Sequence, residues 1–302
     1  MELDISESSL PVYAALASKT RLKLIRFIGN DTKSIGEIAE YLGISNAITT
    51  RHVRQLEDAG LLSSERGTGK NRNKKLVWLN VDSIHISFPE KIYKALECYT
   101  SVIKLGHFTD FCVAPTCGIA TTQKIIGKTD EPKYFMDSER INASLIWLGE
   151  GYLEYKIPNM LNKNEKPEML EIIFEIASEF PISNNVWPSD ITIYVNQLKV
   201  ATYTVSGNFS DVRGRHTPDW WDSRLSQYGV LKHLRINKID TAIDGEIVSD
   251  VTIKNLRLDA EDFITIRFAA EHDAVNKGGM TLFGKGFGNH DQDIIVHSYY
   301  SC

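Results

Sequence analysis

The stretch AITTRHVRQLEDAGLL, residues 47–62, combines a polar, basic side with an apolar one. Val53 and Leu56 lie three residues apart and Gly60 follows, so we expect a short helix that ends near Ala59. Its polar side, Thr-Thr-Arg-His, is either an ordinary solvated surface or a face that contacts a partner. The flanking sequence distinguishes these two interpretations.

Three more helices are expected upstream of this stretch. They cover residues 9–18, residues 19–29, and a segment from Ser34 to Leu42, in which Ser34 and Glu37 have the spacing of a capping box. Gly43 permits a tight turn, and Ser45 is placed to cap the next helix. Two short helices joined by Gly-Ile-Ser are typical of a helix-turn-helix.

A basic hairpin is expected directly after the quoted helix. Residues 61–81 alternate in hydropathy around Gly67 and Gly69, which predicts two strands joined by a turn. Cations near the tip bind phosphates or the minor groove of DNA in many proteins. The candidate DNA-contacting cations of the hairpin are Arg66, Lys70, Arg72, Lys74 and Lys75.

These pieces, in this order and spacing, resemble the winged helix-turn-helix of the ArsR family of bacterial repressors. The resemblance rests on LASKTRLKLIRFI, SIGEIAEYLGIS, TTRHVRQLEDAGLL and the basic hairpin, and covers about the first third of the chain. It implies that the second helix of the pair enters the major groove of double-stranded operator DNA. By position, the DNA-facing residues would be Ser45, Asn46, Ala47, Ile48, Thr50, Arg51, His52, Arg54 and Gln55.

Two residues of this helix depart from the expected pattern. Ile48 stands where a small polar residue is usual, although isoleucine can contact a thymine methyl group. Thr49 stands where an apolar core residue is usual, which predicts a slight rotation of the helix. The alternative to a DNA-reading helix is a solvated helix face.

Residues 89–105, PEKIYKALECYTSVIKL, are expected to form a dimerisation and linker helix. Ile92, Leu96, Tyr99 and Ile103 recur at helical spacing. The resemblance implies that a helix in this place pairs two subunits into a homodimer. The alternative is that the apolar stripe packs on the second domain of its own chain.

The metal sites common in ArsR-like proteins cannot be carried over to this sequence. The helix SIGEIAEYL has no cysteine, and the expected last helix has Cys98 but no histidine. A metal or thiol sensor built on His107, Asp110, Cys112 and Cys117 stays open as an alternative. The spacing of the cysteines does not match a four-ligand zinc site, and Ala-Pro-Thr between them favours a turn.

From residue 106 onward the sequence favours an antiparallel β-sandwich of jelly-roll type. Short β-rich runs alternate with turns, at residues 141–149, 152–158, 169–177, 190–205, 229–239, 249–258, 262–271 and 293–300. The expected fold class is therefore a two-domain α+β protein. Its parts are a winged helix-turn-helix over 1–88, the helix over 89–105, and the sandwich over 106–302.

Residues 207–231 are the candidate ligand-binding segment of the sandwich. The segment is long and weak in strand pattern, and it holds Trp220 and Trp221, whose flat faces suit a sugar ring. The glycine-rich segment 276–294 lacks the features of a phosphate-binding loop, but it can join the rim of the same pocket. The candidate ligand residues are Asp211, Arg213, His216, Asp219, Trp220, Trp221, Gln227, Tyr228, Asn289, His290 and Gln292. The alternative is that one tryptophan plugs the sandwich.

Composition and motifs limit the classes of function that the chain can have. The 302 residues carry a formal net charge of −5, no apolar run long enough for a membrane span, and no signal-peptide pattern. We expect a cytoplasmic protein without a cofactor, and no enzyme, because no hydrolase, zinc-protease or dinucleotide motif is present. The predicted function is a DNA-binding transcription regulator, a repressor, whose sandwich senses a small molecule such as a carbohydrate. The alternative is a sandwich that is structural or docks a protein.

Overall fold

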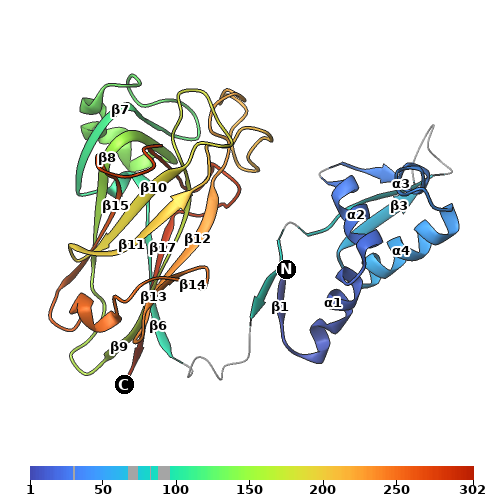
Figure 1. Cartoon of the computed structure of the whole chain (residues 1–302), viewed down its shortest axis with the longest axis horizontal. Helices are drawn as coiled ribbons and strands as arrows, with labels where there is room; N and C mark the ends of the chain where they lie inside the picture. Colours follow the sequence, from blue (N-terminus) through green and yellow to red (C-terminus); the bar gives the residue numbers. More distant parts are fainter. Residues whose placement is uncertain (30, 67–73, 82, 88–95) are drawn as a thin grey trace. The chain divides into compact units, whose positions relative to one another are not determined.

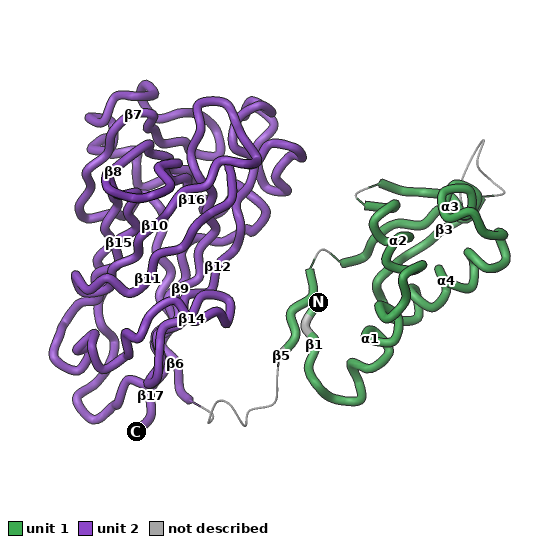
Figure 2. Tube along the Cα trace, viewed as in Figure 1, with its two compact units in different colours: residues 1–95 green, residues 96–302 purple. Residues whose placement is uncertain are grey.

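The computed structural model describes residues 1–29, 31–66, 74–81, 83–87 and 96–302. It divides the chain into two compact units, residues 1–95 and 96–302 (Figure 2). Each unit has its own hydrophobic core, so each is described by itself.

The first unit is a small helical domain with a short sheet (Figure 1). Its helices are α1 (Leu10–Leu16), α2 (Lys19–Ile28), α3 (Ile35–Leu42) and α4 (Asn46–Asp58), preceded by the 3-10 turn η1 (Glu7–Ser9). A three-stranded antiparallel sheet has the order β2 (Lys33–Ser34), β4 (Lys75–Leu79), β3 (Leu62–Arg66). A separate parallel pair joins β1 (Glu2–Asp4) to β5 (His85–Ser87).

The helix ends of this unit follow from the sequence. Ser34 and Glu37 form the capping box at the start of α3. Gly43 ends α3 with a φ of 64°, a left-handed conformation that glycine adopts without a steric cost. Strands β3 and β4 confirm the two arms of the expected hairpin. Its tip, with Lys70 and Arg72, lies outside the described residues.

The second unit consists of strands joined by loops and 3-10 turns. The strands are β6 (Glu97–Ile103), β7 (Asp110–Ala120), β8 (Leu145–Pro158), β9 (Lys166–Ala177), β10 (Ser189–Val195), β11 (Leu198–Val205), β12 (Val230–Ile236), β13 (Thr241–Ile243), β14 (Glu246–Ser249), β15 (Phe263–Ala270), β16 (Met280–Phe283) and β17 (Ile294–Ser301). The turns are η3 (Leu105–His107), η4 (Pro132–Met136), η5 (Ser138–Asn142) and η6 (Ile253–Leu256).

These strands form one antiparallel sheet that folds into two layers (Figure 1). One layer has the order β11-β10-β15-β8-β7 and the other the order β6-β17-β9-β12-β13-β14, while β16 pairs with both β8 and β9 and so joins them. Alternate residues of each strand fill the space between the layers, among them Ile191, Ile193, Ile264, Ile266 and Phe268. The sandwich prediction is confirmed.

The prediction of a helix over residues 89–105 is wrong for residues 96–105, the part of this range that the structure describes. Residues 97–103 form β6, which pairs with β17, and this segment belongs to the second unit. Ile103 is buried in the sandwich core, and Tyr99 stacks on Tyr300. Ile92 lies outside the described residues, and Leu96 directly precedes the strand. Tyr99 and Ile103 of the apolar stripe therefore pack on their own chain, because pairing with the distant β17 outweighs a local helical pattern.

Two smaller expectations are also corrected. Cys112 and Cys117 lie on one strand, β7, and a register shift between Ala114 and Cys117 replaces the expected turn. The run at 249–258 contains the 3-10 turn η6 rather than a continuous strand. Among the described residues, no helix has the length and hydrophobicity that a membrane crossing requires.

Candidate nucleic-acid interface and ligand cavity

Helix α4 separates a buried side from an exposed one. Thr49, Val53 and Leu56 are fully buried against the core of the first unit. The Thr49 hydroxyl donates to the Ser45 carbonyl at 3.1 Å, which allows a threonine to fill a buried position. The residues on the exposed side are Ser45, Asn46, Ala47, Ile48, Thr50, Arg51, Arg54 and Gln55.

His52 differs from these neighbours. It is half-buried, and its Nδ1 is buried without a hydrogen-bond partner among the described residues. Burial lowers the pKa of His52, and the positive charges of Arg21 and Arg51 lower it further. The imidazole is therefore neutral at pH 7 and is a weaker candidate for phosphate contact than the two arginines of α4.

Arg21 on α2 fixes the position of α4. Its guanidinium donates to Gln55 Oε1 on α4 at 2.7 Å and to the carbonyl of Ala14 at 2.8 Å, and its Nε donates to Ala15. One side chain thus joins the C-terminal end of α1 to the outer side of α4. Gln55 is exposed, but its amide oxygen already accepts one hydrogen bond within the protein.

Glu57 fixes the hairpin to the same helix. Its carboxylate accepts from Ser64 on β3 and lies 2.9 Å from the Lys75 ammonium on β4. Lys75 therefore positions the hairpin, and its charge is partly neutralised within the unit. Arg66 and Lys74 are exposed at the ends of the two strands, where their charges face solvent.

The loop of the second unit between residues 207 and 229 is largely held by its own contacts. Trp221 is 4% exposed and packs with Trp147 and Phe287, so a tryptophan does close this part of the sandwich. Gln227 is fully buried and donates to the carbonyls of Asp222 and Leu225. The side-chain amide N–H groups of Gln227 therefore hold this loop together.

Several other candidate ligand residues have partners in the fold. Tyr228 donates to Asp211 at 2.7 Å and stacks on Phe209. The Asn289 side chain accepts from the backbone N–H of Arg215 at 3.1 Å. His216, His290 and Gln292 are half-buried on the same rim.

Trp220 is the exposed aromatic residue of this loop. It is 40% exposed, and its indole N–H donates to the Thr122 carbonyl at 2.7 Å. The ring stands nearly perpendicular to Trp221 and Phe287, which fixes its orientation. Arg213 and Asp219 are exposed beside it and lie 3.6 Å apart.

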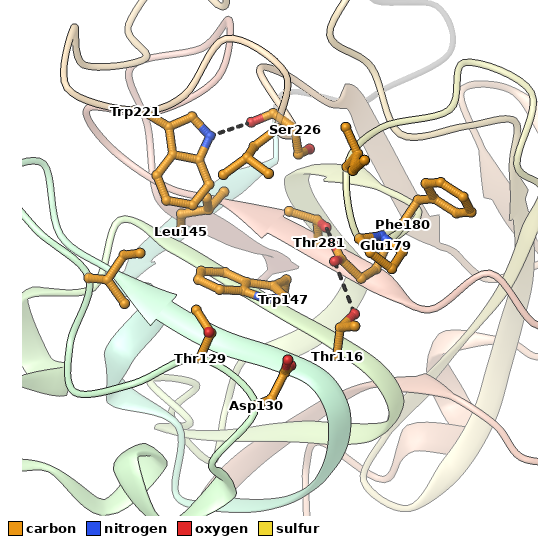
Figure 3. A pocket seen from close by; sticks show the side chains of 14 residues that line it. Thr116, Thr129, Asp130, Leu145, Trp147, Glu179, Phe180, Trp221, Ser226 and Thr281 are labelled. Atoms are coloured by element: carbon orange, nitrogen blue, oxygen red, sulfur yellow. Dashed lines mark hydrogen bonds between the residues drawn. The ribbon is translucent and has the colours of Figure 1, made fainter.

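A cavity of about 260 Å³ lies beneath Trp221 (Figure 3). Trp147, Leu145 and Phe180 supply apolar walls. The carboxyl of Glu179 accepts from Thr116 at 3.1 Å and from Thr281 at 2.9 Å. The cavity is lined by Thr116, Ile125, Thr129, Asp130, Leu145, Trp147, Glu179, Phe180, Pro181, Ile182, Trp221, Leu225, Ser226 and Thr281.

The cysteines do not form a thiolate site. Cys117 is buried, and burial, with the nearby charge of Asp130, raises the pKa of its thiol to about 11, whereas Cys112 is exposed. Across the described ranges, His107, Asp110, Cys112 and Cys117 join no cluster of three or more metal-ligating side chains. The metal or thiol sensor therefore has no geometric support.

Residues 16–65, which include α2, α3 and α4, match the family model described as a helix-turn-helix domain. The first unit therefore contains a helix-turn-helix domain. A search among curated protein sequences finds no match to the chain.

Similar solved structures cover one unit or the other. Reduced HlyU from Vibrio cholerae N16961 is 19% identical over 24% of this chain and 73% of that chain, with a TM-score of 0.22. NolR from Sinorhizobium fredii is 20% identical over 25% and 72%, with a TM-score of 0.23. The CBM36-1 domain of a multidomain xylanase from the hindgut metagenome of Trinervitermes trinervoides is 9% identical over 66% and 97%, with a TM-score of 0.30.

The sequence alone indicated the polar side of α4 but not most of the cavity. Trp221 was a candidate ligand residue, whereas Glu179, Asp130 and Trp147 were not. These side chains come from segments as far apart as residues 116 and 281, and only the pairing of β7, β8, β9 and β16 brings them together. The one local feature of the sequence that could have indicated this cavity was Glu179, which closely follows the apolar strand at residues 169–177.

Proposed function

We propose that the chain is a transcription regulator, acting as a repressor, that reads operator DNA through α4 of the helix-turn-helix domain. The observation that carries the proposal is the division of α4 into a buried side and an exposed polar side. Thr49, Val53 and Leu56 face the core, while Arg51 and Arg54 face solvent. A helix fixed in this way presents a rigid row of donors to the major groove.

The exposed residues have chemistry suited to base and phosphate contacts. Arginine pairs with the O6 and N7 atoms of guanine, asparagine pairs with adenine, and an apolar side chain contacts the thymine methyl. Arg51, Asn46 and Ile48 supply these three groups in that order. Arg66 and Lys74 at the hairpin add sequence-independent contacts to phosphates.

The proposal includes a homodimer on two half-sites. Two copies would place their α4 helices in successive major grooves, about one helical turn of DNA apart. Enrichment of binding sequences from a pool of random duplexes tests both statements. We expect one enriched motif with two-fold symmetry. A single unrepeated half-site would contradict the homodimer, and the absence of any enriched sequence would contradict DNA recognition by α4.

We further propose that the second unit binds a small-molecule effector, a carbohydrate, on Trp220. The half-exposed indole is fixed by its hydrogen bond to Thr122 and by its perpendicular packing on Trp221. A rigid flat ring suits the C–H face of a sugar, and the exposed Arg213 and Asp219 of the same loop offer polar groups to hydroxyls. This assigns binding, and no catalysis, to the sandwich.

A thermal-shift screen of the full chain against mono- and disaccharides tests this part. A sugar that stabilises the wild type and Trp187→Ala, but not Trp220→Ala, supports the site, since Trp187 is a half-exposed tryptophan elsewhere in the same unit. Such a sugar is then expected to change operator affinity by linkage. No shift with any sugar supports the alternative, in which the sandwich is a scaffold or a protein-docking module.

A further inference from the structure

The cavity beneath Trp221 has an acidic lining. Of its fourteen lining residues, two are acids, Glu179 and Asp130, and none is Lys, Arg or His. Asp130 lies at the exposed mouth, where its Oδ1 accepts from the backbone N–H of Cys117 at 2.9 Å. Glu179 lies deeper, between the hydroxyls of Thr116 and Thr281. A cavity with this lining attracts positive charge.

The Glu179 carboxyl has no cationic partner among the residues that line the cavity. Burial raises its pKa to about 8, since its two hydroxyl donors only partly offset the loss of water, and the charge of Asp130 raises it further. Asp130 approaches from the segment after β7, while β7 and β16 contribute only the uncharged Thr116 and Thr281. A bound cation would supply the missing charge.

Aromatic rings form the other walls. The rings of Trp147 and Trp221 lie 5.8 Å apart at 64° (Figure 3). The Phe180 ring lies apart from them and packs on Trp187. Indole faces attract organic cations, and two or three rings around one point form the cages that bind ammonium groups. Gly118 leaves room for this arrangement, because a Cβ there would lie 2.2 Å from the Trp147 ring.

One polar group of the lining has no partner within the protein. Ser226 is 6% exposed, and its hydroxyl oxygen is buried without a hydrogen-bond partner. Buried hydroxyls are nearly always paired with protein, water or ligand. Because this oxygen is not accessible from the cavity, a ligand reaches it only after the Ser226 side chain rotates.

From these contacts we propose that the cavity binds a small organic cation, with its ammonium group between Glu179 and Asp130 and against the rings of Trp147 and Trp221. The volume of about 260 Å³ lies just below the usual range for drug-sized ligands, which fits a small amine. The site is separate from the exposed Trp220 ring. It does not depend on DNA binding or on carbohydrate binding, so it can be tested without either.

A pair of isosteric probes tests the charge requirement directly. Choline and 3,3-dimethylbutan-1-ol have the same shape but differ by one positive charge, and ethanolamine tests a primary ammonium. In isothermal titration calorimetry of the full chain, we expect choline or ethanolamine to bind at least about ten-fold more tightly than the neutral alcohol. Equal affinity for the two isosteres would overturn the proposal, as would binding of calcium chloride or a methyl glucoside with no binding of either amine.

Two substitutions assign the binding to this cavity. Glu179→Gln and Asp130→Asn each keep the size of the side chain and remove a charge, and each is expected to weaken cation binding about ten-fold. Glu246→Gln, at an exposed glutamate of β14, serves as the matched control and is expected to bind as the wild type. Thermal unfolding checks that each variant is folded. Unchanged affinity in both Glu179→Gln and Asp130→Asn would place the cation elsewhere and overturn the proposal.

The pH dependence supplies a further test. A cation favours the charged form of Glu179, whose pKa in the empty cavity is about 8. Affinity is therefore expected to rise from pH 6 to pH 9, and binding at pH 7 is expected to release about one proton. Titration in buffers of different ionisation enthalpy measures this release. Absence of release in the wild type, or the same release in Glu179→Gln, would contradict the role of Glu179.

Discussion

Glu175 joins two loops of the second unit through one buried carboxylate. It accepts hydrogen bonds from the backbone N–H groups of Gly229, Asn289 and His290, each at 2.9 Å. Gly288 allows this contact, since it has a φ of 75° and a Cβ there would lie 2.3 Å from the carboxylate. The rim that carries Asn289 and His290 is therefore built around Glu175.

Replacing Glu175 by glutamine is expected to destabilise the second unit. The amide has one acceptor oxygen, so at least one buried backbone N–H loses its partner, at a cost of about 1–3 kcal/mol. Urea unfolding at pH 5.5, where the Glu175 carboxyl is uncharged and its ionisation does not offset this cost, is followed by tryptophan fluorescence and measures the difference from the wild type. Glu246→Gln, an exposed site, is the control. Equal unfolding midpoints in all three proteins would contradict this account of Glu175.

Two buried carboxyls also predict the pH dependence of stability. Burial raises the pKa of Glu175 to about 7 and that of Glu179 to about 8, from an ordinary value of 4.5. The folded unit therefore binds more protons than the unfolded chain between these values, and stability is lost as the pH rises through this range. We expect a lower urea midpoint at pH 8.5 than at pH 5.5, with a smaller difference in Glu179→Gln. A midpoint that rises with pH would show that other groups dominate.

Helix caps determine where the elements of the helix-turn-helix domain begin. Ser34 and Glu37 close α3 with reciprocal contacts, and Ser45 accepts from the Ile48 N–H at the start of α4. The Ser45 cap lies at the turn between α3 and α4, and the Ser34 cap lies at the opposite end of α3. The Ser45 cap therefore contributes to the placement of the exposed side of α4.

Ser34→Ala is expected to lower the free energy of unfolding of this domain by about 1 kcal/mol, since the Glu37 N–H loses its acceptor. Circular dichroism during urea unfolding measures the change in helix stability. Thr32→Ala, at an exposed residue two positions earlier, is expected to have a much smaller effect. Equal effects of the two substitutions would show that the cap is not a source of stability.

The hairpin predicts a measurable salt dependence. Arg66 and Lys74 are exposed, whereas Lys75 is paired with Glu57. If Arg66 contacts a phosphate, Arg66→Ala is expected to weaken binding to all duplexes similarly and to reduce the slope of log Kd against log salt by about 1. A change confined to one DNA sequence would instead indicate base contact by Arg66.

Local signals allowed the elements of the first unit to be predicted, and distant pairing limited the prediction of the second. The helices α2, α3 and α4 follow from apolar spacing and from Ser34 and Gly43, which act within a few residues. The strand at 97–103 was expected to be a helix because Tyr99 and Ile103 also fit a helical stripe, and its partner β17 lies almost two hundred residues away. The cavity around Glu179 depends on the same kind of distant pairing.

At the scale of the whole molecule, the proposed DNA-binding surface and the proposed cation-binding cavity differ in the sign of their charge. The chain has a formal net charge of −5, yet the exposed side of α4 and the hairpin carry arginines and lysines. An acidic protein with a local basic face binds a polyanion at that face and not elsewhere. The acidic cavity of the second unit, in contrast, suits a cation.

The central claim is that α4 reads DNA, and one binding measurement tests it most directly. Fluorescence anisotropy would compare wild type, Arg51→Ala and Arg26→Ala on the duplex enriched from the random pool; Arg26 is an exposed arginine on α2. Loss of an arginine–base contact predicts binding about ten-fold weaker for Arg51→Ala, with little change for Arg26→Ala. Equal affinity of Arg51→Ala and the wild type, or equal affinity of the wild type for enriched and random duplexes, would contradict the claim.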